Sequence, residues 1–207
     1  MCIRDRFLII FLFSSIAFGF QFTIDKILFN ENQKLLNSKW VKSEYGNPGI
    51  ILETPEPLIR AKNEIFVFED FISESHFYAS NNDKSLELFA INYSTNNKID
   101  PNNFQQILEL SLDKLESYGL QNFLVKYDNF ESNNGAKGLI ISGDTDFLDE
   151  KKNIKKGSYK VIGFLSQTGF KKIIILNHDK RYVREIIERI VSSIELLKEK
   201  KRFKFIF

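Results

Sequence analysis

The chain has 207 residues, of which 43% are hydrophobic, 14% aromatic and 27% charged, and its formal net charge at pH 7 is +2. This composition is sufficient for the core of one ordinary domain and does not comfortably supply two. The near balance of charges does not favour a nucleic-acid binder, which usually presents a strongly basic face.

The first 19 residues have the pattern of a secretory signal peptide. Arg4 and Arg6 precede an apolar run from Phe7 to Phe13, and the small residues Ala17 and Gly19 follow. A basic start, a short apolar core and small residues at alternate positions are typical of cleaved export signals, and the run is too short to cross a bilayer. We therefore predict cleavage after Gly19 and a secreted or periplasmic protein. The mature chain would contain no cysteine, which excludes disulfides, a cysteine nucleophile and cysteine-bound zinc.

The rest of the chain is predicted to form one domain between two short flanking segments. Residues 20–39 are a mixed N-terminal segment with helical character over 25–36. Residues 40–198 form a single α+β domain, and residues 199–207 are a tail of alternating basic and aromatic residues. Before the first predicted helix of this domain, apolar and alternating segments bounded by turn residues indicate strands at residues 49–54, 75–80 and 86–93. The last two flank an Asn-Asn-Asp turn at 81–83.

The first predicted helix of the domain begins at Asp100 and ends before Gly119. Aspartate is a favoured N-cap, and Pro101 occupies the first helical position, where no amide hydrogen bond is needed. Apolar residues then recur at helical spacing as far as Leu115. Glycine adopts the left-handed conformation that commonly ends a helix.

A second helix is predicted to begin near Asp179. Glu185 and Arg189, four residues apart in the favourable order, are placed on its outer face. Its core-facing stripe comprises Val183, Ile186, Ile187, Ile190, Val191, Ile194 and Leu197.

Between the two helices, the sequence predicts four further strands, at residues 123–128, 139–141, 159–165 and 171–176. Turns at 133–135 and 168–169 separate them, and short turns between consecutive strands imply antiparallel pairing. The run Ile173-Ile174-Ile175 favours a central strand covered on both faces. The fold class we predict is α+β: a mostly antiparallel sheet with a helix packed on each face, an α/β/α sandwich.

This order resembles the PsbP-like and DcrB-like α/β/α sandwich proteins. The resemblance rests on Trp40, on a strand ending at Glu53-Thr54-Pro55, on the middle helix, on the strand 138–143 and on the closing helix around 188–194. It covers residues 40–198 and implies a non-enzymatic binder or accessory subunit. It implies no ligand residue at any position of this chain, and fold alone does not define function.

No catalytic residue is predicted. His178 beside Asp179 is compatible with an oriented general base, but no Gly-x-Ser-x-Gly or other nucleophile motif accompanies the pair. We therefore interpret His178 as a loop residue next to a helix cap, and His76 as an ordinary strand residue.

No cofactor or metal ligand is predicted either. Asp144 and Asp146 have the opening spacing of a calcium loop, but the run 144–150 lacks the glycine and the closing glutamate of such a loop. We interpret it as a solvated loop after a strand, with the lysines at 151–152 and 155–156 as a solvated charged face. Gly135 and Gly138 belong to a turn, because no Gly-Lys-Ser/Thr ending follows them.

Three functions compete at this point. The leading hypothesis is an exported, non-catalytic accessory or binding protein of the bacterial envelope, with another envelope protein as its partner and no nucleic acid. The second is a lipid or small hydrophobic ligand binder, suggested by 21 phenylalanines. The third is a hydrolase assembled from distant residues such as His178 and Asp144. The tail at 199–207 is compatible with contact to an anionic membrane surface or with a short added strand.

Overall fold

The computed structural model describes residues 3–46, 49–61, 64–68, 71–80, 85–95, 99–117, 119–148, 153–166 and 169–197. The chain divides into two compact units, Met1–Ser38 and Lys39–Phe207. The predicted turn at 81–83 and the tail at 199–207 lie outside the described residues.

The first unit is one helix, α1 (Ile3–Asn37), which contains the predicted helical segment 25–36 and extends well beyond it. Among its described side chains, five large apolar ones are exposed: Phe20, Phe22, Ile24, Ile27 and Phe29. In the part of the chain that the structure describes, no helix is both long and apolar enough to span a membrane. The helix neither supports nor opposes the predicted cleavage after Gly19, which stays a prediction.

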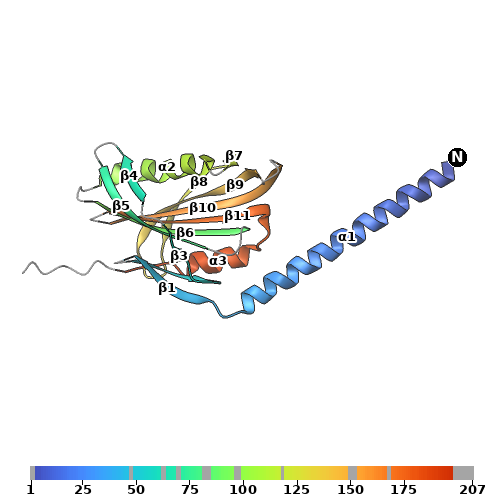
Figure 1. Cartoon of the computed structure of the whole chain (residues 1–207), viewed down its shortest axis with the longest axis horizontal. Helices are drawn as coiled ribbons and strands as arrows, with labels where there is room; N and C mark the ends of the chain where they lie inside the picture. Colours follow the sequence, from blue (N-terminus) through green and yellow to red (C-terminus); the bar gives the residue numbers. More distant parts are fainter. Residues whose placement is uncertain are drawn as a thin grey trace, which may run out of the picture. The chain divides into compact units, whose positions relative to one another are not determined.

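In its described residues, the second unit is built on a large antiparallel sheet of nine strands (Figure 1). Its strands follow the order β3-β5-β6-β11-β10-β9-β7, while β4 also pairs with β5 and β8 also pairs with β9. Antiparallel pairing through short turns is as predicted, and the α+β class is confirmed. The strands are β3 (Ile59–Arg60), β4 (Glu64–Phe68), β5 (Phe71–Ala79), β6 (Leu86–Thr95), β7 (Leu120–Gln121), β8 (Lys126–Glu131), β9 (Lys137–Leu148), β10 (Ile154–Ser166) and β11 (Gly169–Asn177).

Strand β11 lies at the centre of this sheet, and every one of its residues is buried. The isoleucine run 173–175 therefore does occupy a strand covered on both faces, as predicted. Because successive side chains of a strand point to opposite faces, a continuous apolar run is needed where both faces are covered.

A smaller sheet of three strands, β1-β2-β12, was not predicted. It consists of β1 (Val41–Gly46), β2 (Gly49–Thr54) and β12 (Glu195–Leu196). The amide Nδ2 of Asn92 in β6 donates a 2.6 Å hydrogen bond to the carbonyl oxygen of Tyr45. Gly46 has a φ of 101°, and a Cβ there would lie 1.7 Å from Asn92 Nδ2. These contacts hold the end of β1 directly against β6.

The first predicted helix of the domain is confirmed. Asp100 Oδ1 accepts a hydrogen bond from the Asn102 amide at 2.9 Å, the 3-10 turn η1 (Pro101–Asn103) follows, and α2 runs over Phe104–Ser117. Gly119 has a φ of 89°. A Cβ on Gly163 of β10 would lie 2.7 Å from a methyl carbon of Leu108, so α2 packs directly on the sheet. This face holds the main core cluster, which includes Leu108, Ile141, Tyr159, Val161 and Ile174.

A buried lysine also joins α2 to the sheet. Lys172 of β11 is 3% exposed, and its Nζ donates a 2.8 Å hydrogen bond to Ser111 Oγ of α2. The same ammonium lies 5.3 Å from the centre of the Tyr93 ring. A charged group inside a core needs such partners to offset its lost hydration.

The second predicted helix is shorter than expected. A 3-10 turn η2 (His178–Lys180) comes first, with Asp179 at a φ of 55°, and α3 spans only Arg184–Ser192. The prediction of a start near Asp179 and of a stripe reaching Leu197 is therefore wrong. Apolar residues continue after the end of α3 for another reason: Ile194 is buried, and the residues that follow it form β12, which pairs with β2.

The buried face of α3 is the predicted one, with Ile186, Ile187, Ile190 and Val191. Arg189, expected on the outer face near Glu185, instead lies 4.1 Å from the Trp40 ring centre and 2.8 Å from a Glu53 oxygen. These contacts tie α3 to β2.

Candidate functional site

The edge of the large sheet next to β9 is formed by two strands, β7 and β8, with an irregular segment between them at residues 122–125. Asn122 has a φ of 54°, which breaks the ladder after β7. Leu124 then re-attaches to β9, because its amide donates to the Asp144 carbonyl at 2.9 Å. A Cβ on Gly143 would lie 1.7 Å from the Leu124 carbonyl oxygen, so this approach requires glycine. We call residues 122–125 the bulge.

The bulge presents apolar side chains to solvent beside the edge strand. Leu124 is 66% exposed, Val125 41% and Tyr127, in β8, 48%. Phe123 points the other way and makes an edge-on contact with Tyr159, with ring centres 5.2 Å apart. The predicted strand at 123–128 is thus confirmed from Lys126 onward, whereas residues 123–125 are not a strand.

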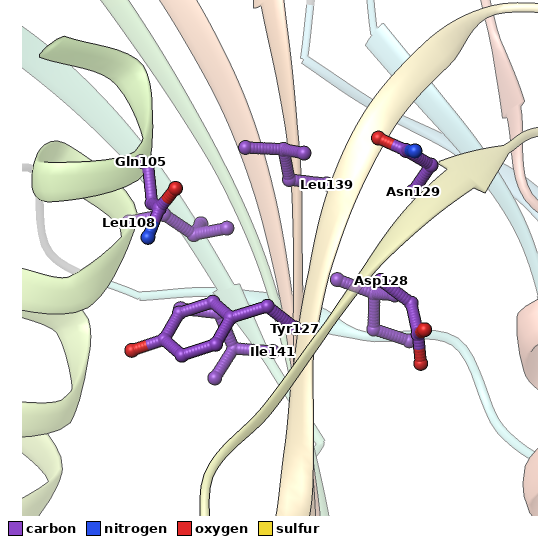
Figure 2. Close-up of a pocket in the computed structure, with 8 residues that line it drawn as sticks. Gln105, Leu108, Tyr127, Asp128, Asn129, Leu139 and Ile141 are labelled. Carbon is purple, nitrogen blue, oxygen red and sulfur yellow. The ribbon is translucent and has the colours of Figure 1, made fainter.

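A cavity of about 300 Å³ lies between helix α2 and strands β8 and β9 (Figure 2). Figure 2 shows Gln105 of α2 directed toward the strands and the Tyr127 ring directed toward the helix. We call this cavity the α2–β8 cleft. Its lining residues are Gln105, Leu108, Tyr127, Asp128, Asn129, Leu139, Ile140 and Ile141.

A carboxylate lies beside the cleft. Gln105 Nε2 donates a 2.9 Å hydrogen bond to Glu109 Oε1. Burial first, and then a hydrogen bond to Glu109 and its negative charge, raise the pKa of the Tyr127 phenol above 10.0. Tyr127 is therefore neutral at physiological pH and offers the cleft both an aromatic ring and a hydroxyl.

The backbone of β8 has a free edge. Two backbone hydrogen bonds flank β8: the Leu124 amide donates to the Asp144 carbonyl before it, and the Ser132 amide donates to the Ala136 carbonyl after it. The even-numbered residues therefore face the strand β9. Antiparallel ladders alternate between residues that bond to the neighbour and residues whose N–H and C=O point away. Tyr127, Asn129 and Glu131 therefore direct their peptide groups outward. In the described part of the chain, no strand pairs with this outer edge.

The two residues of the hydrolase hypothesis are not brought together. His178 packs on the Phe147 ring with centres 3.9 Å apart, and its Nε2 lies 3.1 Å from a Glu87 oxygen, although not aligned as a hydrogen bond. Phe147 belongs to the core cluster below α2. Asp144 lies three residues earlier in the same unbroken strand, so its side chain points to the opposite face.

The acidic run is part of a strand, so its prediction as a loop is wrong up to Leu148. Asp144 and Asp146 lie in β9, and the remaining acids at 149–150 lie outside the described residues. Asp146 is almost buried and contacts Lys156 Nζ at 2.5 Å and Asn122 Nδ2 at 2.8 Å. Among the residues that the structure describes, no group of three His, Cys, Asp or Glu side chains is placed to hold a metal ion. Asp144 and Asp146 lie on the face of β9 opposite to Phe147, where Asp144 is exposed and Asp146 is buried.

The remaining candidate residues from the sequence are His76 and the lysines around residues 151–156. His76 pairs with Asn92 in the β5–β6 ladder, and its side chain lies outside the described part. Lys155 Nζ lies 3.8 Å from an Asp179 carboxylate oxygen, and Lys151 and Lys152 lie outside the described residues.

The predicted turn before β9 is confirmed, and it also joins the two sheets. Gly135 in it has a φ of 79°. Asn134 Nδ2 donates to the Leu196 carbonyl at 2.7 Å, and its Oδ1 accepts from the Leu196 amide at 3.2 Å. The asparagine side chain thus pairs with β12 as a peptide group would.

Neither a protein-family model nor a curated protein matches this chain. The likeness to PsbP-like proteins therefore rests on the sequence motifs alone. The α2–β8 cleft was missed by sequence reasoning, although the apolar residues Leu124, Val125 and Tyr127 are visible in the sequence, because nothing in their spacing marks an edge strand.

Proposed function

We propose that this chain is an exported, non-catalytic accessory or binding protein of the bacterial envelope, which holds another envelope protein at the α2–β8 cleft. The observation that carries the proposal is a cavity of about 300 Å³ lined by the exposed Tyr127, at the same edge of the sheet as the exposed side chains of Leu124 and Val125. Exposed apolar residues gathered beside a concave surface are typical of protein-interaction sites.

The complete architecture proposed is the α/β/α sandwich of PsbP-like proteins, with α2 and α3 on opposite faces of the large sheet. Its support is that α2 packs on β10 whereas α3 is tied through Arg189 to β2 of the smaller sheet. The predicted export signal at residues 1–19 supports the envelope as the location.

The composition of the cleft favours a protein partner over a small hydrophobic ligand. A lipid-binding cavity is enclosed and mostly apolar. Here Gln105, Asp128 and Asn129 share the lining with the aliphatic residues, and Glu109 lies beside it. Such polar groups are suited to the partly hydrated rim of a protein interface.

The test is a pull-down of the exported full-length protein from its native envelope, with mass spectrometry of both the bait and the captured proteins. Gln105→Trp fills the cleft from α2, and Gln106→Trp, on the neighbouring exposed position, is the matched control. We expect a bait that begins at Phe20 and a partner retained by wild type and Gln106→Trp but lost with Gln105→Trp. A partner retained equally by all three proteins would refute the cleft as the binding surface.

A further inference from the structure

The free backbone edge of β8 lies along the same cleft that carries the proposed function. We propose that the partner binds there as an extended polypeptide strand, which pairs with β8 and inserts a side chain into the α2–β8 cleft. This inference rests on the proposed function and names the chemical form of the partner.

The backbone supplies the first argument. Tyr127, Asn129 and Glu131 direct their N–H and C=O groups outward, and these groups meet no partner among the described residues. All three residues are exposed. A strand added to such an edge forms up to six hydrogen bonds, one to each of these three N–H and three C=O groups, and neither a lipid nor a compact ligand reproduces that pattern.

The cavity supplies the second argument. Tyr127 and Asn129 of β8 bound the cavity on one side, and Gln105 and Leu108 bound it on the side of α2. Alternate side chains of an added strand point to the same face. One of them would therefore enter the cleft next to Leu139 and Ile141, which favours an apolar residue at that position.

The charges at the rim restrict the strand further. The Glu109 carboxylate lies beside the cleft, held by Gln105 and by the Tyr127 phenol. Asp128 on β8 is already paired with Lys126 at 2.7 Å. A basic residue flanking the apolar one is thus attracted by Glu109, whereas an acidic residue is repelled.

The free edge of β8 is also short. A short edge admits only a short partner strand, whereas a long edge would pair with many extended chains. The bulge ends the ladder on one side, and the turn that contacts β12 ends it on the other. Bulges and charged residues such as Lys126 are common protections of exposed edges. Only the outward N–H and C=O groups of Tyr127, Asn129 and Glu131 remain open to a partner.

The test selects displayed random 12-residue peptides on the full-length exported protein and then measures the selected sequences as synthetic peptides. We expect apolar peptides with a flanking basic residue, blocked by Gln105→Trp and not by Gln106→Trp. N-methylation at alternate peptide residues should weaken binding about tenfold per removed hydrogen bond, with little effect at the positions between. Asn129→Pro, which removes one outward N–H, should weaken binding more than Asn129→Ala, which removes the same side chain and keeps that N–H.

Each other outcome contradicts strand addition in a distinguishable way. Peptides that compete with the native partner for the cleft but tolerate every N-methyl group would overturn strand pairing and leave the proposed function intact. If no peptide is selected and a fluorescent fatty acid binds in a manner blocked by Gln105→Trp, the cleft belongs to a lipid. Selected peptides that bind equally to Gln105→Trp would place the contact elsewhere and also overturn the inference.

Discussion

The Tyr159 hydroxyl donates a 3.1 Å hydrogen bond to the Leu124 carbonyl, which joins the centre of the large sheet to the bulge at its edge. The same carbonyl lies against Gly143. The backbone of Leu124 is thus fixed from two sides, while its apolar side chain is exposed. The geometry of the bulge therefore depends on Tyr159 and Gly143, neither of which lines the cleft.

Replacement of Gly143 tests this dependence directly. In Gly143→Ala the new methyl group meets the Leu124 backbone, and we expect a loss of about 1–3 kcal/mol in the free energy of unfolding. Gly135→Ala is the comparison, since its positive φ costs about 1 kcal/mol but the space around it is open. Chemical denaturation measures both variants. A Gly143→Ala protein as stable as wild type would show that the bulge is free to move away.

The raised pKa of Tyr159 predicts that the protein loses stability at alkaline pH. Burial, and next the nearby Tyr127, raise the pKa of Tyr159 to about 12. Because the folded state holds this proton more tightly than the unfolded state, the resulting stability is present below pH 10 and is lost as the pH rises toward 12. Tyr159→Phe should lose about 1 kcal/mol at neutral pH, for the missing hydrogen bond, and should be less sensitive to pH above 10. Thermal unfolding between pH 8 and 12 checks this, and parallel curves for the two proteins would contradict it.

Asp146 predicts sensitivity to acid. The hydrogen bond from Lys156, and then that from Asn122, lower the pKa of this carboxyl below 3.8. Its contribution to stability is therefore fully present above the unfolded-state pKa and is lost as the pH falls through the lower folded-state pKa. We expect Asp146→Asn and Lys156→Gln each to be less stable than wild type at pH 7, with the difference shrinking as the pH falls below 4. A difference that stays constant down to pH 2 would show that the pair contributes no proton-linked stability.

The α3 face predicts a contrast between neighbouring positions. Ile187 is buried and Glu185 exposed on the same helix. Ile187→Asp places a carboxylate in the core and should cost on the order of several kcal/mol, comparable to the stability of a small domain. Glu185→Gln should be nearly silent. Equal midpoints of thermal unfolding for the two variants would refute the assignment of the face.

Several features of the fold were accessible from local sequence signals. The Asp100-Pro101 start and Gly119 define α2, because caps act within one helical turn. The isoleucine run of β11 predicted a doubly covered strand because burial on both faces removes the need for alternation.

Other features depend on contacts that are distant in the sequence. Ile194 continued a helical spacing although the chain had left α3 to pair with β2. The acidic run at 144–150 read as a loop because alternating acids on a strand with one polar face look like solvated residues. The cleft could not be predicted from the sequence either, because Gln105 and Tyr127 come together only through the packing of α2 beside an edge strand.

Crosslinking at the cleft tests the central claim most directly. Without residues 1–19 the chain has no cysteine, so Asn129→Cys and Glu185→Cys each carry a single site for a thiol-linked photo-crosslinker in the native envelope. We predict one protein adduct from Asn129→Cys, its loss when Gln105→Trp is added, and none from Glu185→Cys. An adduct formed from Glu185→Cys alone, an Asn129→Cys adduct unaffected by Gln105→Trp, or no adduct at either site would contradict the cleft as the binding surface.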